Sequence, residues 1–154
     1  TMKLILFAFV TLISMQVASQ DVFSEKDARS IVDIFFEGFH KGDTTIMRSV
    51  LHDSIAIQTV FTDAEGNRRL VDSDMDHLLR AISDRPESQT WDERLLSYAV
   101  QIDGNLAQVW TPYEFWLNGT FSHCGANAFT LVSTNTGWRI VHLIDSRRKE
   151  PCRE

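Results

Sequence analysis

The chain of 154 residues has the length of a single domain. Its 44% hydrophobic and 23% charged residues are an ordinary globular composition, and ten Phe and four Trp are enough for a large core or an aromatic-lined cavity. A formal net charge of -6 excludes the electrostatic footprint of a nucleic-acid-binding protein. The only basic cluster, Arg147-Arg148-Lys149, is typical of a solvated tail, with a polyanion site as the alternative.

A secretory signal peptide is the first predicted element. Lys3 gives it a short positive start, and the apolar stretch over residues 4–15 is too short to span a bilayer comfortably. Small residues follow at Val17-Ala18-Ser19, so cleavage is expected after Ser19 or after Ala18. We predict a signal peptide over residues 1–19, one domain over residues 20–148 and a tail over residues 149–154; a buried N-terminal helix is the alternative. The mature protein would be secreted or periplasmic, without stable membrane insertion.

Two helices follow the signal peptide. Ser24-Glu25-Lys26-Asp27 has the pattern of a capping box, and Gly42 is a good residue to end the helix in the left-handed conformation. Between them, apolar residues recur at helical spacing: Ala28, Ile31, Val32, Ile34, Phe35, Phe36 and Phe39. Asp43 can cap a short second helix that ends at Val50.

A strand, a turn and a third helix come next. Residues 55–61 are rich in β-branched side chains and alternate weakly, which favours a strand, and residues 64–67 form a turn. The third helix begins at Ser73-Asp74-Met75-Asp76 and ends before Pro86, because proline cannot continue a helix.

The rest of the chain has the pattern of an antiparallel meander. Asp103-Gly104 and Asn118-Gly119 are strong hairpin signals, because both central residues of a type I′ turn need a positive φ. Together with a looser turn over residues 134–137, they join strands predicted over residues 95–102, 106–116, 121–132 and 138–145. Helices packed on such a mostly antiparallel sheet define an α+β fold.

Pro112 interrupts the second strand of the meander. Proline cannot donate to a sheet ladder, so we expect a bulge or an edge position there. A bulge would bend the sheet over the first helix and leave a cone with a mouth at one end.

The two cysteines leave two alternatives open. Secretion permits a disulfide between Cys124 and Cys152. However, the expected strand pairing places Cys124 opposite about Ser146, which leaves Cys152 roughly 20 Å further along an extended chain. A disulfide needs Cα atoms within about 7 Å, so the tail would have to fold back near Pro151. Otherwise the chain has a buried strand thiol and a free tail thiol.

Counting from the Asn118-Gly119 turn gives the expected strand register. The opposed pairs are Trp116 with Phe121, Glu114 with His123, and Trp110 with Asn127. Opposed residues share a sheet face, so these side chains and Phe129 would gather on one face, with Tyr113, Phe115, Cys124, Ala126 and Ala128 on the other. The sequence does not determine which face is concave.

The Glu114–His123 pair is the sharpest candidate for chemistry. A carboxylate orients an imidazole and raises its pKa, as a general base requires. If this face lines the cone, the pair sits among aromatic side chains with Asn127 as a polar contact, which is typical of an organic-ligand site. The alternative is an exposed ion pair beside surface aromatics, which would favour a dimer interface.

The remaining polar residues give weaker signals. Asp145, near a polar mouth with Arg147, is a candidate ligand anchor, and a surface salt bridge is the alternative. No spacing among the five histidines resembles a metal site, and there is no glycine-rich phosphate loop. We therefore expect no metal and no cofactor.

Three short segments carry a resemblance to a known superfamily. They are Phe39-His40-Lys41-Gly42-Asp43, Leu51-His52-Asp53 and Gly137-Trp138-Arg139-Ile140-Val141-His142-Leu143. In their order and spacing, from about residue 23 to 148, the chain resembles the nuclear transport factor 2-like superfamily, a cone-shaped, cystatin-like α+β fold. Small exported bacterial members, some described as lumazine-binding-like, SnoaL-like or polyketide-cyclase-like, are the most similar.

The resemblance implies a curved sheet, a pocket between the sheet and the first helix, and a homodimer through the outer sheet face. It implies no single activity, because function is not fixed by a fold. Ketosteroid isomerases of this fold use an Asp base, a Tyr donor and a second Asp. Their positions fall on Thr59, Phe35 and near Asn127, and Thr and Phe cannot perform that proton chemistry, so we reject this isomerase activity.

We arrive at three hypotheses for function. The first is an exported protein that binds a small organic molecule, with Phe35, Phe39, Trp110 and Trp116 as walls of the pocket. Its polar contacts would be Glu114, His123, Asn127 and Asp145. The second is a dehydratase or hydrolase that uses His123 with Glu114, and the third is a non-catalytic dimeric interaction module.

Overall fold

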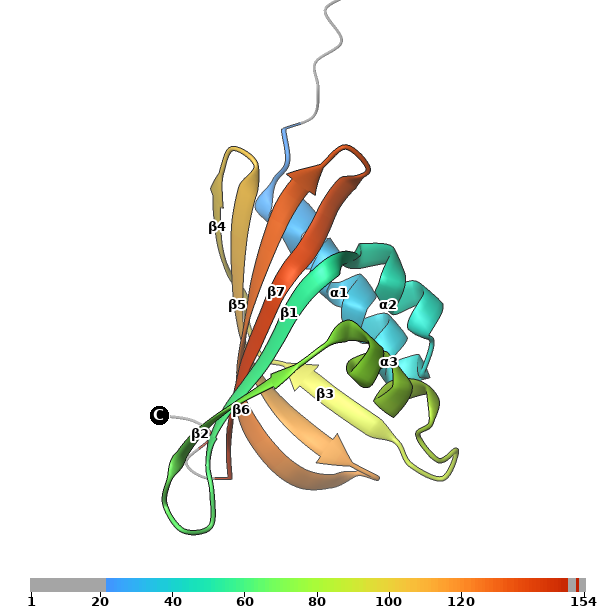
Figure 1. Cartoon of the computed structure of the whole chain (residues 1–154), viewed down its shortest axis with the longest axis vertical. Coiled ribbons are helices and arrows are strands. Elements are labelled where there is room, and N and C mark those ends of the chain that lie inside the picture. Colours follow the sequence, from blue (N-terminus) through green and yellow to red (C-terminus); the bar gives the residue numbers. More distant parts are fainter. Residues whose placement is uncertain (1–21, 150–151, 153–154) are drawn as a thin grey trace, which may run out of the picture.

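The computed structural model describes residues 22–149 and Cys152 (Figure 1). The predicted signal peptide lies outside the described residues. The helices are α1 (Glu25–Lys41), α2 (Thr44–Val50) and α3 (Met75–Ser83). The strands are β1 (Leu51–Thr62), β2 (Arg68–Ser73), β3 (Trp91–Leu95), β4 (Ala99–Asp103), β5 (Leu106–Leu117), β6 (Thr120–Thr134) and β7 (Gly137–Arg148).

Local sequence signals set the ends of the helices. The Ser24 hydroxyl accepts the Asp27 amide at 3.4 Å and the Asp27 carboxylate accepts the Ser24 amide at 2.8 Å, which is the predicted capping box. Gly42 ends α1 in the left-handed region with a φ of 72°. Asp43 caps α2 by accepting two amides of its first turn.

The strands form one sheet in the order β2-β1-β7-β6-β5-β3, with β4 also paired to β5. The predicted antiparallel meander from β4 to β7 is confirmed, while β1 joins β7 in parallel. The single strand predicted over residues 95–102 is wrong, because β3 ends at Leu95 and β4 begins at Ala99. The strand β2 was not predicted, because its charged sequence lacks a clear apolar alternation.

Pro112 explains the break between β3 and β4. No register shift occurs at Pro112, which pairs with Ala126 of β6, so the expected bulge is absent there. The Pro112 carbonyl accepts the Leu96 amide at 2.8 Å, on the side of β5 away from β6. The N and C=O of one strand residue point to the same side, so the missing N–H costs no bond to β6. The missing N–H of Pro112 faces the other side of β5, at the place where the partner strand β3 ends and the partner strand β4 begins.

The sheet curves around the helices. In Figure 1, β3 and the adjoining ends of β5 and β6 curl beneath α1 and α3, which cover the concave face. The core joins α1 to that face, where Phe35 and Phe36 pack edge-on against Phe129 of β6 at 5.7 and 6.1 Å between ring centroids. The layers confirm the predicted α+β cone.

Cys124 and Cys152 form a disulfide, with Cα atoms 5.7 Å apart. The geometric argument against this bond was wrong. Arg148, rather than Ser146, lies opposite Cys124, in part because a register shift between Thr130 and Leu131 moves the pairing by one residue. Cys152 is then only four positions beyond that partner, and a bend at Lys149 turns the chain back toward β6. The bond holds Cys152 on the convex side of β6.

Removing the disulfide is expected to destabilise the folded chain. The bond closes a loop with a sequence separation of 28, and loop entropy alone predicts a loss of about 3–4 kcal/mol in the free energy of unfolding. Denaturant unfolding with and without reductant measures it. A Cys124→Ala/Cys152→Ala double variant should be insensitive to reductant, and a wild-type protein equally insensitive would contradict the bond.

Candidate functional site

A one-residue bulge rearranges the face on which the site was predicted. Trp116 pairs with Phe121 as expected, but Ser122 is then an extra residue in β6, and the register shifts. Beyond it, Phe115 pairs with His123 and Glu114 pairs with Cys124. The predicted Glu114–His123 pair is therefore wrong, because a shift of one residue moves a side chain to the other face.

The predicted face consequently splits in two. His123 and Asn127 lie on the concave face with Phe115 and Tyr113, which the sequence argument had placed on the opposite face. Asn127 is opposed by Thr111 rather than by Trp110.

Glu114, Trp110 and Trp116 lie on the convex face, away from the cavity. Trp110 is 52% exposed, and the Arg94 guanidinium lies 4.4 Å from the Trp116 ring centroid. Trp110 and Trp116, predicted as walls of the pocket between the sheet and α1, do not line it, and neither does Glu114, predicted as a polar contact.

The concave face and the helices enclose a cavity of about 500 Å³. Its walls come from α1, α3 and the strands β1, β2, β3, β5, β6 and β7. Five of the predicted site residues line it: Phe35, Phe39, His123, Asn127 and Asp145. The walls are otherwise mainly apolar and include Phe36, Ile57, Leu78, Trp91, Phe115 and Leu143. A mainly apolar hollow with a few polar groups is the usual form of an organic-ligand site.

Glu93 is the most perturbed acid of this cavity. Asn127 donates to its carboxylate at 2.8 Å. Burial raises the pKa of Glu93 from 4.5 to about 7, the Asn127 bond opposes this increase, and the Asp145 charge adds to it. The Glu93 side chain therefore exchanges a proton near neutral pH.

His40 at the end of α1 fixes the position of Glu93. Its Nε2 accepts the Glu93 amide at 3.0 Å. Burial lowers the pKa of His40, despite an opposing effect of Asp92, and this favours the neutral ring that can accept. The end of the helix thus holds the short strand β3 with Glu93 facing the cavity.

Asp145 is the centre of a second polar cluster on the cavity wall. The buried carboxylate accepts the Thr59 hydroxyl at 2.6 Å, the Tyr113 hydroxyl at 3.2 Å and Arg147 Nε at 2.7 Å. Burial and the negative charge of Asp145 raise the pKa of Tyr113, so its hydroxyl stays protonated and donates. The predicted proximity of Asp145 and Arg147 is confirmed.

Gly125 allows this cluster to form. The Tyr113 hydroxyl also donates to the Ser146 carbonyl at 3.1 Å, and a Cβ on Gly125 would lie 1.6 Å from that same oxygen. Only glycine fits where β6 approaches β7 this closely.

His123 lies where the cavity opens. Its Nδ1 is 3.1 Å from the Ser122 hydroxyl, and its ring packs against Phe115 with centroids 4.9 Å apart. Burial, and secondarily the Arg147 charge, lower the pKa of His123, which keeps the imidazole neutral near pH 7. A neutral imidazole can accept or donate a hydrogen bond to a ligand.

Sequence reasoning missed Glu93, Thr59 and Tyr113 as site residues. The signal for Glu93 was present, since Trp91, Glu93 and Leu95 alternate and place an acid between two apolar residues of one face. The positions carried over from the isomerases, Thr59, Phe35 and Asn127, all line the cavity.

Glu93, Asn127 and His123 can form hydrogen bonds with a ligand, and Glu93 can also exchange a proton with it.

Among the residues that the structure describes, no group of three or more His, Cys, Asp and Glu side chains could hold a metal ion. The same part of the chain contains no helix long and apolar enough to cross a membrane.

Comparison with solved structures defines the class of protein as the nuclear transport factor 2-like fold. An NTF2-like protein of unknown function from Shewanella baltica shares 19% identity and a TM-score of 0.58, over 84% of this chain and 100% of that one. An NTF2-like protein from Cytophaga hutchinsonii has 11% identity and a TM-score of 0.64, over 82% of this chain and 100% of that one. An NTF2-like "putative dehydratase" from Streptomyces avermitilis has 14% identity and a TM-score of 0.60, over 80% of this chain and 94% of that one.

The family follows from the sequence itself. Residues 24–143 match the family described as "Putative lumazine-binding", and the chain belongs to that family. No curated protein matches the chain. The predicted superfamily and fold class are thus confirmed.

Proposed function

We propose that the protein binds a small organic molecule in the cavity between α1 and the concave face of the sheet. The observation that carries this proposal is the hydrogen bond between partly buried Glu93 and buried Asn127, 2.8 Å long, on the wall of a mainly apolar hollow of about 500 Å³. Isolated buried carboxyls are unfavourable, so a polar group kept on an apolar wall favours a role toward a ligand.

The walls suit a ligand with an apolar body and a polar group. Phe35, Phe39 and Trp91 supply aromatic surface, and each Å² of apolar area removed from water contributes roughly 25 cal/mol. Glu93, with a pKa of about 7, can donate a hydrogen bond when protonated and accept one when ionised. A carbonyl on the ligand would accept a hydrogen bond from protonated Glu93, and a hydroxyl on the ligand would donate one to ionised Glu93.

A cavity-filling variant tests this proposal. Ala81 of α3 lines the cavity and is solvent-accessible, so Ala81→Trp should fill space without disturbing the core. We expect the neutral fluorescent probe N-phenyl-naphthylamine to bind the wild-type chain and to bind this variant about ten-fold more weakly or worse.

The matched control is Ala99→Trp, on β4 outside the cavity. It should bind the probe as the wild type does. A wild-type chain that does not bind the probe, or two Trp variants that bind it equally, would overturn the proposal.

An acid–base enzyme is the second candidate. Proton transfer works best when the pKa of the catalytic group lies near the working pH, and the pKa of Glu93 is about 7. His123 lines the same cavity and would be the partner, in place of the pair with Glu114. Once a converted compound is found, Glu93→Gln should abolish turnover and retain binding; retained turnover would remove this candidate.

We also propose export and a homodimer through the convex face. The disulfide supports export, because such bonds persist in oxidising compartments. The exposed Leu106 and Trp110 support an interface, since apolar surface normally marks a partner. Export is tested by measuring the mass of the chain recovered outside the cytoplasm, and a chain that stays uncleaved in the cytoplasm would contradict it.

The homodimer is tested by native mass spectrometry, and a monomer in the spectrum would contradict it.

A further inference from the structure

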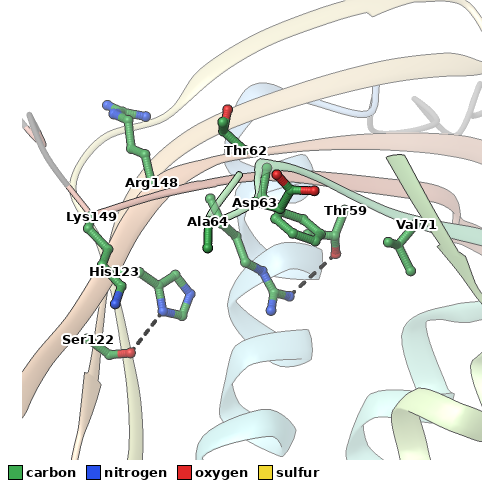
Figure 2. A pocket seen from close by; sticks show the side chains of 11 residues that line it. Thr59, Thr62, Asp63, Ala64, Val71, Ser122, His123, Arg148 and Lys149 are labelled. Carbon is green, nitrogen blue, oxygen red and sulfur yellow. Dashed lines mark hydrogen bonds between the residues drawn. The ribbon is translucent and has the colours of Figure 1, made fainter. Parts of the chain in front are cut away.

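The cavity opens into a wider hollow at one end of the sheet. This mouth has a volume of about 1150 Å³ and shares Thr59, Val71, His123 and Arg147 with the inner cavity (Figure 2). A ligand in the inner cavity that extends past these side chains would therefore place its outer part in the mouth.

The mouth is positively charged in an acidic protein. Arg147, Arg148 and Lys149 line it, although the formal net charge of the chain is -6. The acid among its lining residues is Asp63, whose carboxylate accepts the Asn67 backbone amide at 2.8 Å and so closes the β1–β2 turn. Arg147 is paired with Asp145 at 2.7 Å, so the charge that favours an anion at this place comes from Lys149.

The polar groups of the mouth converge from two strand ends. Figure 2 shows the Lys149 side chain pointing toward His123 and Ser122, whereas Arg148 points away from them. The Arg147 guanidinium is held by Asp145 and Thr59 and its side chain remains 50% exposed. An ammonium, a hydroxyl, an imidazole and a guanidinium edge therefore surround one region.

The disulfide keeps this arrangement in place. Lys149 follows the end of β7 at Arg148, and Cys152 is fixed to Cys124 of β6, next to His123 in sequence. A lysine on a tethered tail loses less conformational freedom on binding than one on a free tail. The basic run first interpreted as a solvated tail is thus part of the wall of the mouth.

We propose that this mouth binds the oxyanion of an amphipathic organic acid whose apolar body occupies the inner cavity. Lys149 supplies the charge, and Ser122 and His123 supply directional hydrogen bonds. This assignment of ligand class rests on the proposed binding function. The proposal predicts that two sets of residues contribute to affinity separately. Residues of the mouth act on the anionic group of the ligand, and the walls of the inner cavity act on its apolar body.

Two probes with one aromatic scaffold separate these contributions. Anilinonaphthalene sulfonate carries an oxyanion, and N-phenyl-naphthylamine is its neutral counterpart. We expect Lys149→Gln to weaken the sulfonated probe about five-fold and Lys149→Glu to weaken it more than about ten-fold, with the neutral probe unchanged within about two-fold. Raising the salt concentration should weaken the sulfonated probe alone.

Lys26→Gln is the matched control, because Lys26 is exposed at the start of α1, at the opposite end of the molecule from the mouth (Figure 1). It should change neither affinity. Ala81→Trp should weaken both probes, which places them in the cavity.

The outcomes distinguish the two proposals. If both probes bind and Lys149→Glu affects them equally or not at all, the anion site is overturned and the cavity stands. If the wild-type chain does not bind the neutral probe, the binding function itself is overturned, and the ligand class with it.

Discussion

Replacing Glu93 with Gln is expected to stabilise the folded chain at about pH 8 and to leave its stability nearly unchanged below about pH 4.5. In the wild type, burial raises the pKa of this carboxyl from 4.5 to about 7. A raised folded-state pKa stabilises the fold fully below about pH 4.5, and this contribution is lost as the pH rises through about 7. Gln is neutral throughout and can still accept from Asn127, so it avoids a penalty of about 2–3 kcal/mol at alkaline pH.

Denaturant unfolding of both chains at several pH values measures this effect. Glu65→Gln, in the exposed β1–β2 turn, is the matched control and should not change the pH dependence of stability. A Glu93→Gln chain that is less stable than the wild type at pH 8 would show that the carboxylate is held ionised by its neighbours, and the account of Glu93 would fail.

Replacing Asp145 with Ala is expected to destabilise the folded chain by about 2–4 kcal/mol. The buried carboxylate accepts hydrogen bonds from Thr59, Tyr113 and Arg147, and its removal leaves these donors without that acceptor. The estimate allows for the half-exposed Arg147 side chain, which water can solvate, and for Tyr113, which keeps its bond to the Ser146 carbonyl.

The chain contains its own control for this variant. Arg94 and Asp92 on β3 form an Nε–Oδ2 pair two residues apart at 2.7 Å, the same spacing and distance as Arg147 and Asp145. The Asp92 side chain is 39% exposed and that of Asp145 is 11% exposed, so Asp92→Ala should cost less than about 1 kcal/mol. Equal losses from the two substitutions, measured by denaturant unfolding, would contradict a structural role for burial at Asp145.

Much of the fold could be predicted because its signals are local. The capping box at Ser24, the left-handed Gly42 and the Asn118-Gly119 turn each define an element boundary through the backbone of a few residues. The parallel pairing of β1 with β7 brings together residues 86 positions apart, as in the Thr59–Asp145 bond, and a single sequence contains no local signal for it.

The candidate site could be predicted only in part, for the same reason. Side chains along a strand alternate between the two faces of the sheet until one extra residue reverses the alternation. Ser122 is that extra residue, between the Asn118-Gly119 turn and His123. Phe35 and Phe39 line the cavity as expected, because they lie four residues apart on one face of the uninterrupted helix α1 and no extra residue turns one of them away. Glu93 was missed because β3 is short, and its partner Asn127 lies 34 positions away.

A crystal structure of the chain from residue 20, grown with N-phenyl-naphthylamine, tests the central claim most directly. The account predicts density for the probe between α1 and the concave face, in contact with Phe35 or Phe39 and within reach of Glu93 and Asn127. A cavity closed by its own aromatic side chains, with the probe absent or bound only on the convex face at Trp110, would contradict it.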